Sequence, residues 1–554
     1  MESATVSHAV VRRVAAASLA AFLVPWAVLP AAAATGSTIH VTSLDPAAQL
    51  DTQCNLAEAI DSANNDNGGG ECINGSGADK IVFDVSGTVT YAGELPAIGS
   101  DLTIDGSGVV LDAAGHTGFY ATSGTVRFVN VQIQNARNGI YGQSGLFSLV
   151  RSTIRNTSGA SASAIGVSGG TLTIVSSTIT GSTGADSEAS RGVDASGGSV
   201  VTISNSTIAD NEWGITEGDF STMTVINSTI TDAGPLAYFV ATGSRLVVRN
   251  SILIGGADLG GVLDDDGTNL FAADRTGILA SGAPAAHGGP TPTIPLLSTA
   301  TGAIDKGNPD FCPVVDQRGA TRSTTCDLGA YERDTVKPTV TAPTPSIRTS
   351  ATLSGSSLPV RIKWTASGTG SGIDHAVLQR STDGGSWTTV SSSITGSSRD
   401  VTLAKGHSYR FRVQVFDWDN NASSVVSGPS FTTVLTQDTS SAITYSGTWS
   451  SQSSSLFSGG ATRYSKSSGA SAKLAFSGRS VGFVTTLLGD RGQAKIYIDG
   501  TLVTTVNLLS GGPTYRAIAY QKSWSSSGSH TIKVVVVGTA GNPRVDVDAF
   551  AVLK

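Results

Sequence analysis

Residues 147–154 read FSLVRSTI, and the pattern returns as LTIVSSTI at 172–179, VTISNSTI at 201–208 and MTVINSTI at 223–230. Looser copies are VRFVNVQI at 126–133 and LVVRNSIL at 246–253. Each copy has apolar residues at its first, third and eighth positions, and the copies follow one another at intervals of 21, 25, 29, 22 and 23 residues. Apolar residues two apart, reset at each copy, predict short strands stacked in register, each rung too thin to bury its own core. The sequence therefore predicts a parallel β-helix.

Length and composition allow two to four domains in the 554 residues. The 66 glycines and only 14% charged residues fit turn-rich β structure, and the 39% hydrophobic residues argue against disorder. The net charge is −7, without a basic run or stripe, which argues against nucleic acid as the main partner.

The first 34 residues resemble a secretory signal. Arg12 and Arg13 precede a mostly apolar stretch at 14–29, and Ala32-Ala33-Ala34 supplies small residues for cleavage. An uncleaved membrane anchor is the alternative, disfavoured because Pro25 and Pro30 interrupt the apolar run. We expect a mature chain without a transmembrane segment, either secreted to the extracellular space or held at the cell surface.

Both ends of the repeat region resemble a known family. Residues 54–60, CNLAEAI, are similar to the "CSLREA" box of secreted bacterial β-helix proteins, with departures at Asn55 and Ala57. The sequences HGGPTP at 287–292 and CDLGAYE at 326–332 resemble the closing "choice-of-anchor" segment of such proteins. The resemblance implies a right-handed parallel β-helix with an N-terminal cap over residues 38–332, on an exported protein, but no particular reaction.

Four cysteines form two local pairs, Cys54 with Cys72 and Cys312 with Cys326. Four cysteines allow three connectivities, but proximity in an exported chain favours these two disulfides. Loops this short would each contribute about 3 kcal/mol of stability in the chain-entropy model.

Two further all-β units are expected after a linker at 333–346. Residues 347–435 resemble a fibronectin type III β-sandwich, in which Trp364 and Tyr409 would be core aromatics. Residues 443–554 resemble a jelly-roll of the galactose-binding-like type, a candidate carbohydrate-binding module, through IYIDG at 496–500, GSHTI at 528–532 and VDAF at 547–550.

Carboxylates on adjacent rungs are candidates for catalysis. Asp210 and Asp232 both stand two residues after the last position of a copy, so stacking would bring them to about 5 Å, as in a retaining glycosidase. Asn, Gly and Asp share this column, however, which favours a turn with left-handed backbone angles. The column consists of Asn135, Asn156, Gly181, Asp210, Asp232 and Gly255.

A second column stands three residues before the last position of each copy. Stacked amides there could hydrogen-bond from rung to rung, and Arg151 would turn outward. Its members are Asn130, Arg151, Ser176, Asn205, Asn227 and Asn250.

Two acidic groups raise the question of a ligand. Asp264 and Asp266, with Asn269, supply oxygen atoms on a turn, so calcium is conceivable, although a solvated loop is the simpler interpretation and no cofactor is firmly implied. Four acidic residues flank Trp213 and could line a wet groove, or belong to an ordinary exposed rung. They are Asp210, Glu212, Glu217 and Asp219.

A complete acid/base constellation is not evident, since no lysine lies between Lys80 and Lys306 and His116 is the sole histidine between His40 and His287. We therefore lean against an enzyme.

Aromatic rings of the last unit are candidates for stacking on sugars, namely Trp449, Tyr464, Tyr515 and Trp524. We expect binding to an extracellular polysaccharide or cell-wall glycan, in the context of adhesion. The alternatives are a polysaccharide lyase or glycoside hydrolase acting on the β-helix groove, and a purely structural or protein-binding surface component.

Overall fold

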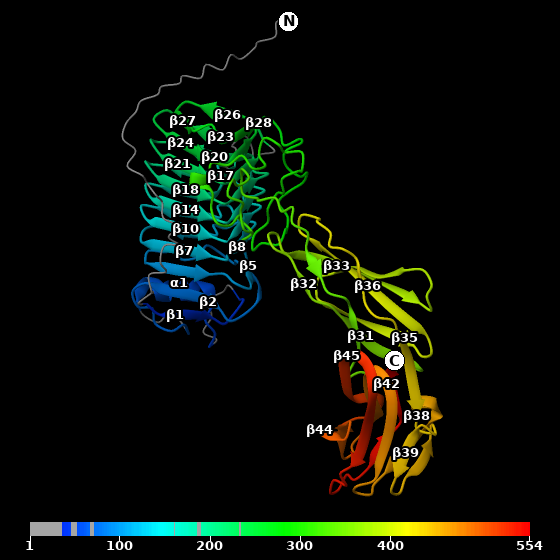
Figure 1. Cartoon of the computed structure of the whole chain (residues 1–554). Helices are drawn as coiled ribbons and strands as arrows, with labels where there is room; N and C mark the ends of the chain where they lie inside the picture. The colour runs from blue at the N-terminus through cyan, green and yellow to red at the C-terminus, as the bar shows by residue number, and fades with distance from the viewer. Residues whose placement is uncertain (1–35, 46–51, 67–70, 160, 185–189, 232–233) are drawn as a thin grey trace.

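The computed structural model describes residues 36–45, 52–66, 71–159, 161–184, 190–231 and 234–554. The predicted signal at 1–34 lies outside these residues, as does Asp232. Within them the chain forms a solenoid followed by two antiparallel units that project from its side (Figure 1). No helix among the described residues is long and apolar enough to cross a membrane.

The solenoid is a parallel β-helix whose described strands form three sheets, which confirms the prediction. The first sheet is built from the front half of each repeat, and successive strands lie in register, with Phe147 beside Leu172 and Leu172 beside Val201. Its strands are β1 (Thr38–Val41), β2 (Asp79–Phe83), β4 (Leu102–Asp105), β7 (Thr125–Val129), β10 (Leu146–Val150), β14 (Thr171–Val175), β18 (Val200–Ser204), β21 (Thr222–Ile226), β24 (Arg245–Arg249) and β27 (Val262–Asp265).

The second and third sheets complete each turn of the solenoid. The second consists of β3 (Gly87–Thr90), β5 (Val109–Asp112), β8 (Gln132–Gln134), β11 (Thr153–Arg155), β15 (Thr178–Thr180), β19 (Thr207–Ala209), β22 (Thr229–Thr231), β25 (Ile252–Ile254) and β28 (Leu270–Ala272). The third consists of β6 (Phe119–Ala121), β9 (Ile140–Gln143), β13 (Ser163–Ser168), β17 (Arg191–Ser196), β20 (Trp213–Glu217), β23 (Leu236–Val240) and β26 (Ala257–Leu259). β12 (Ser158–Gly159) and β16 (Thr183–Gly184) pair beside them.

The solenoid core consists of apolar columns from all three sheets. The eighth residue of every copy is buried in it: Ile133, Ile154, Ile179, Ile208, Ile230 and Leu253. Each such column repeats at the spacing of adjacent strands, about 4.8 Å, so side chains of one column stack directly on one another. This stacking is how rungs too thin to fold alone share one core.

The rung-to-rung hydrogen bonds differ in part from the prediction. They run mainly through a buried serine column one residue later, in which the Ser152 amide donates to the Ser177 hydroxyl and the Ser177 amide to Ser206. The predicted column instead provides left-handed turns, with φ of 46° at Asn205 and 47° at Asn250. Arg151 is exposed as predicted, and its Nε donates to the Asn130 side chain at 3.2 Å.

A helix, α1 (Leu56–Asn65), lies at the N-terminal end of the solenoid and begins within the segment that resembles the CSLREA box. Asn55 caps it, because its side chain accepts from the Glu58 amide while Glu58 accepts from the Asn55 amide. The departure at Asn55 therefore keeps a residue that caps helices well. The predicted Cys54–Cys72 disulfide is present beside this helix.

The first antiparallel unit begins inside the predicted linker, since β29 (Thr339–Val340) and part of β30 (Thr344–Ile347) lie there. Trp364 and Tyr409 are buried in its core, as predicted. The remaining strands are β31 (Ser357–Lys363), β32 (Ala366–Ser367), β33 (Ile373–Thr382), β34 (Thr388–Ile394), β35 (Ser398–Ala404), β36 (Ser408–Asp417), β37 (Val426–Ser427) and β38 (Phe431–Gln437).

The second antiparallel unit is joined to the first through one sheet. β38 pairs with β36 at its start and with the last strand, β47 (Ala549–Leu553), along the rest of its length. The other strands are β39 (Ile443–Ser446), β40 (Ser450–Ser453), β41 (Ala461–Ser465), β42 (Ser471–Leu487), β43 (Gln493–Ile498), β44 (Thr501–Asn507), β45 (Thr514–Val536) and β46 (Val545–Val547). Leu553 and Val484 share a core with Trp364, so the two units are packed together.

Candidate functional site

The closing segment, residues 287–332, covers the side of the solenoid next to the second sheet. Asn205, Asn227 and Asn250 donate from their side-chain amides to its carbonyls at Val315, Phe311 and Asn308, at 3.0, 2.5 and 2.9 Å. Three members of the column therefore bind the chain's own closing segment, which occupies this part of the solenoid surface.

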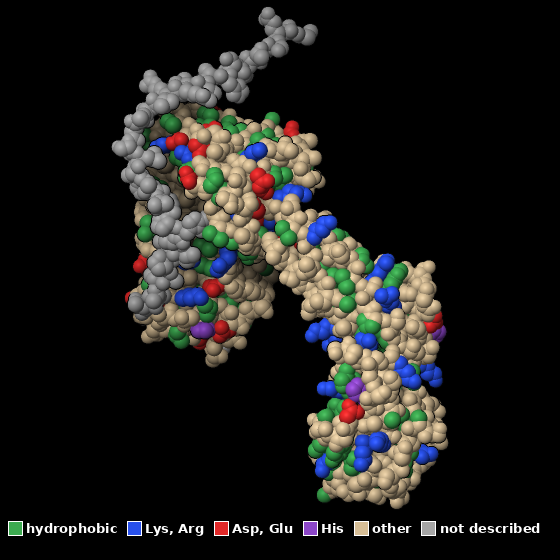
Figure 2. Space-filling view, viewed as in Figure 1, with side chains coloured by type: hydrophobic (Ala, Val, Ile, Leu, Met, Phe, Trp, Pro, Cys, Tyr) green, Lys and Arg blue, Asp and Glu red, His purple; other side chains and the backbone are tan. Residues whose placement is uncertain are grey.

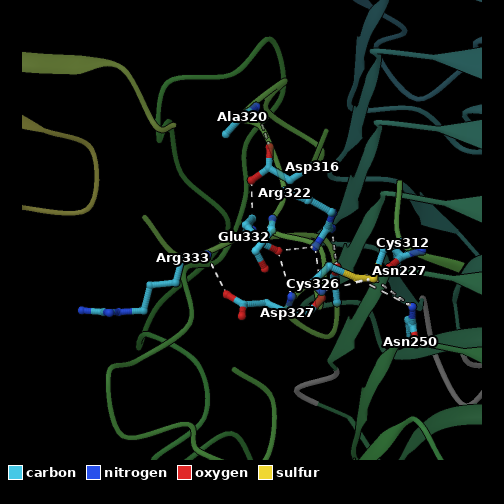
Figure 3. Close-up of polar contacts among 12 residues, drawn as sticks. Asn227, Asn250, Cys312, Asp316, Ala320, Arg322, Cys326, Asp327, Glu332 and Arg333 are labelled. Carbon is cyan, nitrogen blue, oxygen red and sulfur yellow. Dashed lines mark hydrogen bonds and ion pairs between the residues drawn. A yellow bond between two sulfur atoms is a disulfide. The ribbon is translucent and has the colours of Figure 1, made fainter. Parts of the chain in front are cut away.

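A buried ionic network holds the closing segment together (Figure 3). The Arg322 guanidinium donates to Glu332 Oε2 at 3.0 Å and to Asn205 Oδ1 at 3.1 Å. The predicted Cys312–Cys326 disulfide is present, and the Asn250 amide lies 3.7 Å from Cys326 Sγ. Burial, aided by the Glu332 charge, raises the pKa of Asp327 to about 6. Because these groups are enclosed and bonded to one another, the network serves the fold.

Asp210 occupies a left-handed turn, with φ of 54°, as do Asn135, Asn156 and Gly181 at equivalent positions. Its carboxylate forms an ion pair with Arg275 at 2.7 Å. Asp232, its predicted catalytic partner, lies outside the described residues. The turn interpretation of this column agrees with the backbone angles, and the catalytic pair stays a prediction.

The oxygen atoms of the predicted calcium loop already have protein partners. Asp264 contacts Arg245 and lies 3.1 Å from Arg249, and these two cations outweigh burial, so the pKa of Asp264 lies below its usual value. Asp266 accepts from the Thr268 amide and hydroxyl, while Asn269 Oδ1 accepts from the Ser251 amide. The described residues include no group of three or more His, Cys, Asp or Glu side chains that could hold a metal ion.

The four acids flanking Trp213 do not form a groove. Glu217 is 1% exposed and lies in register between Ala195 and Val240, inside the solenoid. The prediction that it lies in a groove or on an exposed rung is therefore wrong. Glu212 accepts from the amides of Gly184 and Ser190 at 2.7 and 3.1 Å.

Trp524 is the centre of a mixed aromatic and polar cluster in the last unit. Its ring stacks on the His530 imidazole, with centroids 3.8 Å apart and planes 14° apart, and Phe476 packs beside both. His530 Nδ1 lies 2.8 Å from Asp499 Oδ2, whose side chain is 48% exposed. These interactions with His530 and the Thr531 amide lower the pKa of Asp499, so a carboxylate contacts the imidazole on which the half-buried indole stacks. Such a combination can stack on a sugar ring and accept hydrogen bonds from its hydroxyls.

The other three predicted aromatics lie elsewhere in this unit. Trp449 packs against Tyr445, and its Nε1 donates to the Ser446 carbonyl. The Arg544 guanidinium lies 3.9 Å from the Tyr464 ring centre, and Tyr515 meets Phe457 edge to face. All are half-buried, and their ring contacts are with Tyr445, Arg544 and Phe457, whereas those of Trp524 are with Phe476 and His530.

Sequence reasoning missed a hollow on the solenoid, of about 320 Å³, beside the third sheet. Tyr120 and Tyr141, on adjacent rungs, have ring centres 6.0 Å apart with planes 24° apart. Glu94 and Arg137 line the same hollow and form an ion pair at 3.0 Å. The two tyrosines share one register position, a signal visible only once β6 and β9 are aligned.

The visible surface carries acidic side chains mainly on the solenoid and Lys and Arg mainly on the antiparallel units (Figure 2).

Among known families, residues 107–276 match the right handed beta helix region, so the solenoid is a right-handed parallel β-helix.

Two curated proteins of Flavonifractor plautii are similar to part of this chain. An A type blood alpha-D-galactosamine galactosaminidase is 31% identical over 120 residues, which are 22% of this chain and 11% of that protein. An A type blood N-acetyl-alpha-D-galactosamine deacetylase is 30% identical over 118 residues, 21% of this chain and 15% of that protein. The chain thus spans well under a fifth of either relative's length.

Among solved structures, a CBM36-1 domain of a multidomain xylanase from the hindgut metagenome of Trinervitermes trinervoides matches at 16% identity and a TM-score of 0.17. The match covers 22% of this chain and 96% of that domain.

Proposed function

We propose that the protein is an exported glycan-binding protein that attaches non-covalently to an extracellular polysaccharide or cell-wall glycan, in adhesion. The observation that carries the proposal is the half-buried Trp524 stacked on His530 beside the exposed Asp499 carboxylate. The carbohydrate-related relatives support the chemistry, and the two disulfides fit an oxidising, extracytoplasmic compartment.

The test is retention of the full mature chain on a panel of immobilised glycans. The panel contains xylan, mannan, cellulose, chitin, peptidoglycan and a glycan ending in N-acetyl-α-D-galactosamine, the last chosen from the relatives' substrates. We expect at least one glycan to retain the chain, and Trp524→Ala to weaken that retention roughly tenfold, as loss of one stacked ring would.

The matched control is Trp387→Ala. Trp387 is also half-buried, with the Arg412 guanidinium 4.5 Å from its ring centre, but it belongs to the first antiparallel unit. Asp499→Ala, a substitution at an exposed position, tests the same cluster without removing a packed ring. Failure of every glycan to retain the chain, or unchanged retention of both cluster variants, would overturn the proposal.

A glycan-cleaving enzyme is the second candidate, since the two curated relatives are named for reactions on glycans. Incubating the full chain with each glycan of the panel and measuring released sugars or acetate tests it. A soluble product would support this candidate over simple attachment.

A further inference from the structure

The outer face of the third sheet carries one column of side chains in register across six rungs. The residues on either side of each member, such as Ile165 and Val167 or Val193 and Ala195, point into the core, so the members between them point outward. The column is Tyr120, Tyr141, Gly166, Asp194, Thr216 and Phe239, and the exposed Asp258 of β26 continues it on a seventh rung. We call this column, with Arg191 and Trp213, the outer strip.

Aromatic rings lie at both ends of the outer strip. At one end the Tyr141 ring extends over Gly166, where an added Cβ would come within 3.0 Å of the ring. At the other end Trp213 and Phe239 stack with centres 5.9 Å apart and planes 30° apart. Tyr141 and Phe239 are four rungs apart, about 19 Å along the solenoid at about 4.8 Å per rung. The glycine thus lets a ring lie across the sheet.

Polar groups occupy the middle and the edges of the strip. Asp194 accepts a hydrogen bond from Thr216, and the Arg191 guanidinium lies 3.8 Å from Asp194 and 5.8 Å from the Trp213 ring centre. Tyr120 donates to Gln143 at 2.8 Å beside the hollow. Asp194 is paired with Arg191 in the strip, and Glu94 with Arg137 beside it, while the exposed Asp258 at the end of the column adds a negative charge.

We infer that the outer strip binds an extended, uncharged polysaccharide chain lying along the solenoid axis. The rings at the two ends pack on the apolar faces of sugar rings, while Asp194, Arg191 and Gln143 exchange hydrogen bonds with hydroxyls between them. The internal pairing of charges favours a neutral chain over a polyuronate, whose carboxylates would need unpaired cations. This inference deepens the proposed function and rests on it, but it uses a separate site.

The test measures the affinity of the full chain for soluble xylan, mannan and glucan, with polygalacturonate and gelatin as a polyanion and a polypeptide. We expect a neutral polysaccharide to bind, and Trp213→Ala and Tyr141→Ala each to weaken it roughly tenfold. Leu146→Ala is the control, since Leu146 is an exposed apolar side chain on the first sheet of the same solenoid. Melting temperatures verify that each variant is folded.

The outcomes separate this inference from the proposed function. Binding weakened by Trp524→Ala but unaffected by Trp213→Ala and Tyr141→Ala would overturn the outer strip and leave the terminal cluster standing. Weakening by the strip variants alone would support the strip and remove the terminal cluster. Preference for polygalacturonate or gelatin over every neutral polysaccharide, or equal weakening by Leu146→Ala, would overturn the inference.

Discussion

At the scale of single residues, we expect Glu217 to make the stability of the solenoid depend on pH. It lies in the core, neither carboxylate oxygen has a hydrogen-bond partner of normal geometry, and burial raises its pKa to about 8, only partly opposed by the Met223 backbone. Between its ordinary pKa of 4.5 and about 8, the unfolded chain has lost a proton that the folded chain keeps. The free energy of unfolding therefore falls as the pH rises through this window.

Glu217→Gln should remove that dependence, because glutamine stays neutral at every pH. We expect wild type to lose on the order of 3 kcal/mol between pH 4.5 and pH 7 through this group, at about 1.36 kcal/mol per unit. The glutamine variant should lack this part of the decline and be at least as stable at pH 8. Melting temperatures of both proteins from pH 5 to 9 provide the measurement, and parallel profiles would contradict the prediction.

Asp210 tests the two interpretations of its column. Asparagine tolerates the left-handed angle and loses only a partly exposed ion pair with Arg275, so Asp210→Asn should unfold within about 1 kcal/mol of wild type. Asp210→Ala should cost about 1 kcal/mol more, because alanine is strained there. Urea unfolding measures both. If the chain cleaves a glycan and folded Asp210→Asn has lost that activity, the catalytic interpretation is favoured.

At the scale of elements, the repeat positions recognised in the sequence fall in the first two sheets and none falls in the third, for one physical reason. The step from the first sheet to the second is a fixed turn, so Phe147 and Ile154 stand seven residues apart, as do Leu172 and Ile179. The next step crosses loops of variable length: seven residues from Ile133 to Ile140 but fourteen from Ile179 to Val193. Because these loops vary in length, the register of the third-sheet strands cannot be read from the sequence. The outer strip depends on that register and was therefore missed.

Side-chain roles were less predictable than strands. The asparagine column was recognised as structural, but its partners lie 58 to 110 residues away in the closing segment, and no local pattern specifies them. Glu217 was grouped with the other acidic residues that flank Trp213, and the sequence alone does not distinguish it from them. Burial of a charged residue is an exception to hydrophobic patterning, so only the fold reveals it.

The buried ion pair between Arg322 and Glu332 predicts how strongly the closing segment depends on one enclosed cation. Arg322→Ala removes the cation facing Glu332 and leaves that carboxylate buried, so we expect a loss of about 3 to 5 kcal/mol. Arg333→Ala is the control, because the Arg333 side chain points away from the network while its backbone amide donates to Asp327 (Figure 3). Thermal unfolding compares the two, and equal losses would show that Arg322 has no special role.

At the scale of the whole molecule, the two antiparallel units form an arm that is joined to the solenoid by direct contacts and is continuous within itself. Arg318 of the closing segment lies 3.4 Å from Asp419, and Trp418 meets His287 edge to face. Within the arm, β38 and β47 form one sheet. The two proposed glycan sites are therefore held at a set separation instead of being tethered by a flexible linker.

The shared sheet predicts how fragments behave. Residues 443–554 alone would lose the β38 partner of β47 and expose the buried side chains of Val484, Ile518 and Leu553. Such an edge with an apolar face favours aggregation. We expect residues 334–554 to be monomeric and cooperatively folded, and 443–554 to aggregate. Size-exclusion chromatography with thermal unfolding checks this, and a stable monomer from the short fragment would contradict it.

Two rigidly separated sites also predict a dependence on glycan length. A short oligosaccharide reaches only the terminal cluster or the outer strip, whereas a long chain can contact both, which raises apparent affinity by roughly 100-fold or more. Trp524→Ala and Trp213→Ala should each abolish the higher affinity for long chains. For a short oligosaccharide, each variant should weaken binding only at the site that carries the substitution. Titrating wild type and both variants with one polysaccharide graded by length measures it. Affinity that does not depend on length would mean that the sites act separately, because a set geometry can also prevent joint binding.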